Sequence, residues 1–197
     1  VTTDGGTSAP FVTALASIDS VAATGTPADP AQASANAGQT VILRGTGLSS
    51  VRPVVVRYLD GSGALRYLMI APTDVAADGA SANLLLPAFV NGAFEVQLLG
   101  SASQPRLQIV PVLSTFDITG NSLRLTGRGF VEGAATYRFA QGIVPDESAS
   151  AGANVVSLSG VDNSAVDVAG VVHGLGDVEV VTVGGSATLA LNYVNTG

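Results

Sequence analysis

The side chains that carry acid–base or nucleophilic chemistry are scarce in this sequence. His173 is the only histidine, and no Gly-x-Ser-x-Gly segment accompanies it to present a nucleophilic serine. The chain also lacks cysteine and lysine, since its eight basic side chains are all arginine. These absences exclude thiolate and Schiff-base catalysis. The sequence therefore predicts a protein that is not an enzyme, with His173 in an exposed turn between strands.

Two glutamates raise the question of glycoside hydrolysis, which needs a pair of carboxyl groups. Glu95 and Glu179 occupy equivalent positions in two similar segments, Phe94-Glu95-Val96 and Val178-Glu179-Val180. Side chains alternate between the two faces of a strand. We therefore expect the flanking apolar residues to point inward and each glutamate to face solvent on its own sheet.

One group of oxygen-bearing side chains is the candidate for a metal site. Asp162, Asn163 and Asp167 lie close together between predicted strands, and oxygen ligands of this kind can bind Ca²⁺. The EF-hand spacing is absent, so the alternative is that they are ordinary turn residues. No other cofactor is predicted, because the glycines of residues 127–133 lack the spacing and the following helix of a nucleotide-binding loop.

An internal repeat organises the chain. Residues 38–48 match residues 120–130 at a constant offset, and three glycines coincide in the two copies. Further on, Arg57-Tyr58 lies over Arg138-Phe139, each arginine standing beside an aromatic residue. We expect these arginines to point outward with their stems over a sheet face, the alternative being a ligand or subunit contact. A repeat of this length indicates two similar structural units.

Within each unit the apolar residues recur with a period of two, which is typical of half-buried strands. Turn signals at Asp60-Gly61, Asp78-Gly79, Asn91-Gly92 and Gly184-Gly185 separate the runs. No window reads as a capped amphipathic helix. The predicted fold class is all-β, with two tandem β-sandwich domains. The predicted strands of the first unit are about residues 16–21, 40–44, 54–59, 65–70, 81–86, 94–100 and 106–110.

Pro111 marks the predicted domain boundary. A strand over residues 106–110 runs almost directly into one over 112–118, so the connection has little slack and restricts the angle between the domains. The predicted organisation is a flexible lead-in at 1–9, a first domain at 10–110 and a second at 111–197. Residues 22–37, rich in Ala, Thr, Pro and Asp, are predicted as an inserted loop that the second unit lacks.

Both units resemble the IPT/TIG family of immunoglobulin-like domains. Each shows a proline, an apolar strand, the pattern Gly-x-x-apolar-x-apolar-x-Gly-x-Gly and then Leu48 or Phe130. The resemblance implies an immunoglobulin-like fold, and a structural or binding module of bacterial surface and secreted proteins. The last glycine pair of each motif fits a tight turn with positive φ, after which Leu48 or Phe130 returns to the core. The motif glycines are Gly38, Gly45, Gly47, Gly120, Gly127 and Gly129.

Charge and hydropathy limit the classes of partner that the chain is predicted to bind. A net charge of −7 opposes nucleic acid, and no apolar run reaches the roughly 18–20 residues of a membrane span, so neither nucleic-acid binding nor membrane insertion is predicted. With aromatic residues at 5% and no Trp, a carbohydrate-binding platform is disfavoured.

The functional expectation is a spacer or stalk at the bacterial cell surface or in a secreted protein, with neighbouring domains of the same chain as partners. A recognition or self-assembly unit, such as an adhesin tip or a surface-layer or filament subunit, is the alternative; its partners would be protein subunits or cell-surface ligands. An accessory domain of a polysaccharide-active enzyme is the third hypothesis. The insertion at residues 22–37 is where a function would be sought first.

Overall fold

The structure is a computed structural model that describes residues 2–3, 6–7, 12–146, 156–159, 163–170 and 176–191. In these residues every regular element is a β-strand, so the predicted all-β class is confirmed. The described part of the chain accordingly holds no helix that could cross a membrane.

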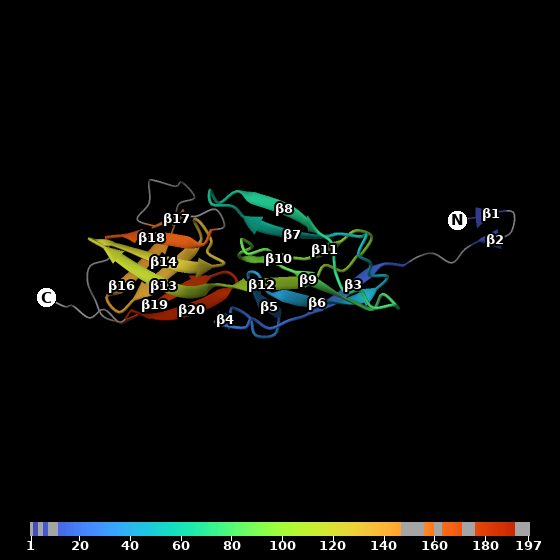
Figure 1. Ribbon diagram of the computed structural model, residues 1–197, viewed down its shortest axis with the longest axis horizontal. Coiled ribbons are helices and arrows are strands. Elements are labelled where there is room, and N and C mark those ends of the chain that lie inside the picture. Colours follow the sequence, from blue (N-terminus) through green and yellow to red (C-terminus); the bar gives the residue numbers. More distant parts are fainter. Residues whose placement is uncertain are drawn as a thin grey trace.

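Two separate hydrophobic cores underlie two β-sandwiches. One core gathers buried side chains between Leu15 and Ile109, and the other gathers those between Leu123 and Leu191. The two sandwiches lie end to end along the long axis of the molecule (Figure 1). The chain enters the first at its outer end through β3 and leaves the second at the opposite end through β20 (Figure 1).

The first sandwich packs one three-stranded sheet against two others, also three-stranded, that share the segment 93–98. The three-stranded sheet has the order β3 (Ala14–Asp19), β6 (Thr40–Thr46), β9 (Ser81–Leu85). The other two sheets are β11 (Gln97–Leu98), β7 (Val54–Leu59), β8 (Leu65–Ile70) and β10 (Ala93–Glu95), β12 (Arg106–Val110), β5 (Ala33–Asn36). The predicted strand at 94–100 is divided at Val96 because the segment changes its partner there, from β12 before Val96 to β7 after it.

The second sandwich is built from two sheets, each with more strands than a sheet of the first. One has the order β13 (Val112–Thr119), β14 (Ser122–Arg128), β18 (Ala165–Ala169), β17 (Val156–Ser159). The other has the order β16 (Gly142–Asp146), β15 (Ala135–Phe139), β19 (Gly176–Thr182), β20 (Gly185–Leu191), β4 (Thr26–Pro27). Its last member comes from the first unit of the repeat, which no sequence pattern indicated.

The period of two predicted for the strands is visible in their burial. Val41 and Leu43 of β6 are fully buried while Ile42 and Arg44 are exposed. In β14, Leu123 and Leu125 are buried in the same alternation.

The glycine motif occupies the same geometry in both sandwiches. Gly47 and Gly129 have positive φ angles of 62° and 75°, and the next residues, Leu48 and Phe130, are buried in the cores. Gly45 has a different role, because a Cβ there would collide with the backbone of Ala14 on the neighbouring strand. Gly127 meets the backbone of Val112 in the same way. A register shift lies beside each contact, between Leu15 and Ser17 and between Leu113 and Thr115.

The prediction that residues 22–37 are a loop throughout was wrong. The segment contains two strands: β5 runs parallel to β12 of the first sandwich, and β4 runs antiparallel to β20 of the second. Ala35 of β5 is completely buried. The local sequence Ala-Ser-Ala-Asn has low strand propensity, and pairing with β12 and burial against the core override it.

The predicted lead-in also contains regular structure. Within residues 1–9, β1 (Thr2–Thr3) and β2 (Gly6–Thr7) pair as a short antiparallel ladder.

Candidate functional site: the joint between the sandwiches

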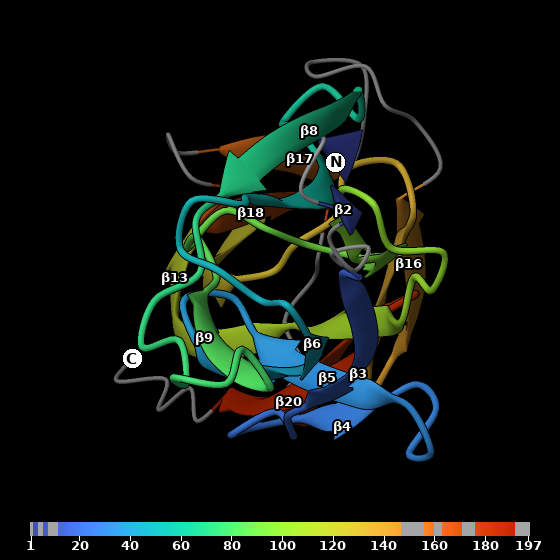
Figure 2. The same cartoon turned by 90° about the vertical axis from the view of Figure 1, so that its right-hand side faces the viewer.

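The segment 22–37, hereafter the strap, crosses the boundary between the two sandwiches. Gly185 and Ser186 of β20 pair with Pro27 and Thr26 of β4, and the Ala28 N–H donates to the Gly184 carbonyl at 3.4 Å. The strap then returns to the first sandwich as β5. Seen along the long axis, β4, β5 and β20 lie together, on the side of the molecule opposite β8 (Figure 2). One segment of the first unit therefore extends a sheet in each sandwich.

Two buried amide side chains hold the strap against β12. Gln108, 2% exposed, accepts a hydrogen bond from the Asp29 N–H and donates one to the Asp29 carbonyl, both at 2.8 Å. Asn36 donates from Nδ2 to the carbonyls of Val110 and Thr24, both at 3.0 Å, and its Oδ1 accepts from the Thr24 N–H at 2.9 Å. Because buried polar groups are costly when unpaired, these bonds fix the path of the strap.

A third buried amide spans the joint itself. Asn91 is 2% exposed. Its Nδ2 donates to the carbonyl of Leu59 at 2.9 Å and to that of Phe130, in the second sandwich, at 2.7 Å. Its Oδ1 accepts from the Leu59 N–H at 2.9 Å. From the second sandwich, Asn163 donates to the same Leu59 carbonyl at 3.3 Å. The end of β7 is thereby tied to both sides of the boundary.

Close backbone approaches complete the joint. Gly184, in the turn between β19 and β20, lies so near the carbonyls of Ile109 and Gly92 that any side chain would collide with them. A Cβ on Gly25 of the strap would lie 2.6 Å from the Ser186 carbonyl. Glycine is required at these positions because two backbones meet there, which is the second use of glycine besides positive φ.

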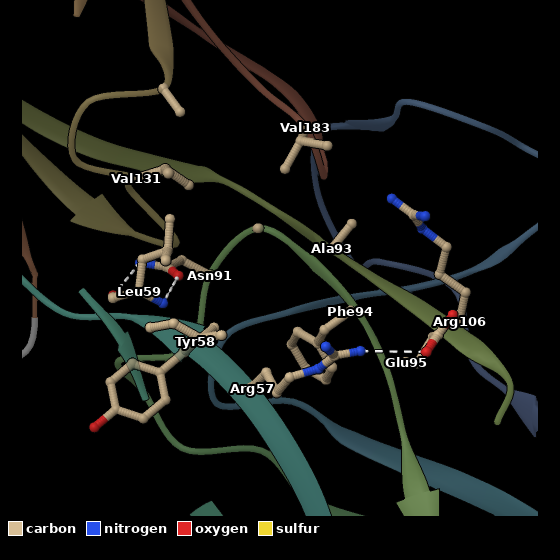
Figure 3. Close-up of a pocket in the computed structure, with 13 residues that line it drawn as sticks. Arg57, Tyr58, Leu59, Asn91, Ala93, Phe94, Glu95, Arg106, Val131 and Val183 are labelled. Atoms are coloured by element: carbon tan, nitrogen blue, oxygen red, sulfur yellow. Dashed lines mark hydrogen bonds and ion pairs between the residues drawn. The ribbon is translucent and has the colours of Figure 1, made fainter. Parts of the chain in front are cut away.

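Two hollows flank the joint. The smaller, of about 240 Å³, lies between the outer face of β7 and β10 and the second sandwich, which contributes Val131, Ala134 and Val183 (Figure 3). The larger, of about 720 Å³, lies between residues 36–39, where the strap ends, and strands β13 and β14. Arg128 lines it, and its guanidinium donates to the Ala37 carbonyl at 3.5 Å.

The repeated arginines and glutamates, predicted as separate features, pair with one another. Arg57 binds Glu95 at 3.3 Å, and Arg138 binds Glu179 at 3.2 Å. The expected outward orientation of the glutamates is found, since Phe94, Val96, Val178 and Val180 are buried. Each glutamate is held by an arginine of its own sandwich, and the structure does not bring the two carboxylates together as a catalytic pair.

The candidate calcium ligands are not gathered where the structure describes them. Asn163 is buried and directed at the Leu59 carbonyl, whereas Asp167 pairs with Arg124 on the outer face of β14 and β18 at 3.3 Å. Asp162 lies outside the described residues, as does His173. Within the described ranges there is no group of three His, Cys, Asp or Glu side chains that could hold a metal ion.

A buried phenol in the second core is a further polar group. The Tyr137 side chain is fully buried, and its hydroxyl has no hydrogen-bond partner in the described part of the chain. Burial raises the pKa of Tyr137 above its ordinary value, and the charges of Asp146 and Glu132 raise it further. The phenol therefore stays neutral and behaves as a core side chain.

The side chains that build the joint were missed from the sequence. Asn91 was interpreted only as a turn residue in Asn91-Gly92. Gln108 alternates with Leu107 and Ile109, so period two predicts an exposed position, but the strap covers it. A polar residue within an apolar strand was the only signal available for Gln108.

Comparisons with known proteins give no family assignment. No protein-family model matches the chain. No curated protein matches it either. Among solved structures, a surface glycan-binding protein of Prevotella bryantii is similar at 14% identity and a TM-score of 0.43, covering 91% of this chain and 42% of that one. SGBP-B from a xyloglucan utilization locus in Bacteroides uniformis is similar at 13% identity and a TM-score of 0.35, covering 91% and 48%.

The extending region of a large adhesion protein, a tetra-tandem repeat, is similar at 19% identity and a TM-score of 0.26, covering 92% of this chain and 50% of that one. The chain spans half or less of the length of each of these three structures.

Proposed function

We propose that this chain is a non-catalytic spacer segment of a bacterial cell-surface or secreted protein. In this proposal two IPT/TIG-type domains, residues 10–110 and 111–197, hold neighbouring parts of the same protein at a set distance and direction. The observation that carries the proposal is the strap, which gives one strand to each sandwich and so makes the joint a hydrogen-bonded connection.

The two sandwiches are also joined by a very short covalent connection. Strand β12 ends at Val110 and β13 begins at Val112, with only the buried Pro111 between them. A bending motion would have to break the bond from Asn91 to the Phe130 carbonyl and the bond from Asn163 to the Leu59 carbonyl. Each buried hydrogen bond is worth about 0.5–1.5 kcal/mol, and an orphaned partner costs about 1–3 kcal/mol. Several such bonds at one joint favour a single arrangement over free rotation.

The rigidity of the joint can be measured by pulsed electron–electron double resonance, which gives the distribution of distances between two spin labels. Because the chain has no cysteine, the double variant Ser50→Cys and Thr119→Cys carries labels only at these exposed positions. Ser50 follows β6 of the first sandwich, and Thr119 ends β13 of the second. We expect one narrow distance distribution, no wider than that of the Ser50→Cys and Ala71→Cys pair within the first sandwich. A broad or bimodal distribution would overturn the proposal.

One observation favours the alternative of a recognition or self-assembly unit. Strand β8 pairs only with β7 in the described sheets, and three apolar side chains on its outer face are exposed: Leu65 at 49%, Tyr67 at 63% and Met69 at 71%. An open edge with an apolar row is a place where strands of other chains can add. Sedimentation velocity over a wide concentration range separates the two functions: a constant monomer supports the spacer, and growing oligomers that Tyr67→Ser and Met69→Ser abolish support self-assembly.

A further inference from the structure

The smaller hollow at the joint is an open depression that combines apolar and charged side chains. Leu59 and Phe94 of the first sandwich and Val131 and Val183 of the second line it (Figure 3). Its volume of about 240 Å³ lies just below the usual range of ligand pockets, roughly 300–1,000 Å³. It therefore suits a ligand the size of a single ring, not a polymer segment.

Three charged side chains form a row at this hollow. The register of the strands places Glu95 beside Arg106, and the Glu95 carboxylate binds Arg57 at 3.3 Å. The guanidinium of Arg106 is directed away from Glu95, toward the side of the hollow formed by Ala93 and Val183 (Figure 3). None of the ion pairs found between described residues includes Arg106. The row carries two positive charges against one negative charge.

The guanidinium of Arg57 is incompletely bonded as well. Its Nε is buried and has no hydrogen-bond partner among the described residues. The net charge of the whole chain is −7, but charges farther away than about 8 Å are screened at physiological ionic strength. The local excess of arginine therefore decides which ligand charge this hollow favours.

The second sandwich lacks this arrangement although it repeats the ion pair. The partner of Glu179 on the next strand is Thr188, where the first sandwich has Arg106. Arg138 and Glu179 therefore neutralise one another without an additional cation. The additional arginine and the apolar wall from a neighbouring domain occur together only at the joint, among the residues that the structure describes.

We propose that this hollow is a binding site for a small organic carboxylate whose ring lies against Leu59 and Val183 and whose carboxylate is bound by Arg106, with Arg57 beside it. The planar guanidinium presents paired N–H donors that match a carboxylate, which a lysine ammonium does not. The site goes beyond the spacer function and does not depend on it. The ring is either an apolar ring or that of a sugar acid, since both fit the same charge and size.

The test uses two matched probe pairs, benzoate with its neutral analogue benzamide, and D-galacturonate with D-galactose. Backbone amide shifts of the folded chain are followed by NMR during titration. We expect one acid to shift the signals of residues 57–59, 91–95, 131 and 183 saturably, while its neutral partner does not. Which acid binds identifies the kind of ring. Absence of saturable shifts with both acids, or equal shifts with the neutral partners, overturns the proposal.

Three variants assign the effect to the arginines. Arg106→Gln is expected to weaken binding of the active acid roughly tenfold or more, because it removes a charged hydrogen-bond donor. Arg138→Gln, the change at the repeated pair of the second sandwich, should leave the affinity unaltered. Glu95→Gln should strengthen binding, since it removes the carboxylate that competes for Arg57. Unchanged affinity in both Arg106→Gln and Glu95→Gln would refute the site even if the acid bound elsewhere, and the spin-label distances report independently on the spacer.

Discussion

The two sandwiches share their internal construction and differ in what they contribute to the joint. Both place a glycine against the first strand, at Gly45 and Gly127, and both carry one outward arginine–glutamate pair. The joint, in contrast, takes its strap and the side chains of Asn91 and Gln108 from the first sandwich. The second sandwich offers backbone groups, such as the Phe130 carbonyl and the edge of β20, together with the side chains of Asn163 and Arg128. The features that both sandwiches share therefore stabilise the fold of each one. The features found in only one sandwich form the connection between the two.

The largest effects are expected from filling the space beside the two equivalent glycines. Gly45→Val and Gly127→Val each push a side chain into the backbone of the first strand, at Ala14 and Val112. Backbone does not yield as a flexible side chain does, so we expect losses of about 1–3 kcal/mol or more in unfolding free energy. A calorimetric melt should show Tm lowered by roughly 4–8 °C per kcal/mol.

Hydrogen exchange measured by mass spectrometry shows which sandwich each valine weakens. Gly45→Val should accelerate exchange mainly in β3, β6 and β9, and Gly127→Val mainly in β13, β14 and β18. The alanine variants at the same two positions serve as the graded control, with smaller losses in the same places. If either valine variant accelerated exchange equally in both sandwiches, the two units would not be separate packing units.

The next effect concerns the joint. Asn91→Ala removes the side-chain partner of the Phe130 carbonyl and of the Leu59 N–H, while the Leu59 carbonyl keeps Asn163; an orphaned buried group costs about 1–3 kcal/mol. We expect the Ser50–Thr119 spin-label distribution to broaden, while the distribution within the first sandwich stays narrow. Asn121→Ala, an exposed turn position of the second sandwich, is the control. A distribution that stayed narrow in Asn91→Ala would show that the strap and Pro111 suffice to hold the joint.

A smaller and more local effect is expected at the strap. Gln108→Ala removes both hydrogen bonds to Asp29, while β4 and β5 keep their backbone pairing with the two sandwiches. We expect amide exchange to accelerate at Ala28 and Asp29 by roughly tenfold, which corresponds to about 1.4 kcal/mol. Gln104→Ala, at an exposed position before β12, should leave these amides unchanged. Equal protection of Ala28 and Asp29 in wild type and Gln108→Ala would mean that the strap is held by its backbone alone.

The strands could be predicted because the alternation of apolar and polar residues within each strand shows which of its faces is buried. Val41 and Leu43, for example, alternate with Ile42 and Arg44 within five residues, and the repeat supplied a second copy of the same pattern. The joint has no comparable pattern in the sequence. Gln108 is buried by a segment about 80 residues away in sequence, and β5 pairs through a stretch of Ala, Ser and Asn that favours no strand locally. Sequence periodicity reports the faces of an element, not which distant segment covers them.

The two sandwiches also differ by one carboxylate. Asp60 lies in the β7–β8 turn of the first unit, and the equivalent residue of the second unit is Gln141. Asp60 accepts hydrogen bonds from the hydroxyl and N–H of Ser62, from the Arg66 guanidinium and from the Ala64 N–H, at 2.7–3.0 Å. The Ser62 hydroxyl and then Arg66 lower the pKa of Asp60 well below its ordinary value. A carboxyl whose pKa is lower in the folded chain stabilises the fold above its unfolded pKa, about 3.9, and loses that contribution as pH falls through the folded pKa.

Asp60→Asn should therefore lower Tm slightly at pH 7, and the gap to wild type should close as the pH is lowered from about 5 toward 2. The effect is expected to be the smallest of the four because the Asp60 side chain is partly open to water, 26% exposed, and its charge is screened. Asp117→Asn removes one exposed negative charge from the second sandwich and controls for net charge. Thermal melts of the three proteins across this pH range decide the matter. A gap between Asp60→Asn and wild type that persisted unchanged at low pH would show that the aspartate acts through its shape, as an asparagine would, and the charge difference between the two turns would then have no part in their stability.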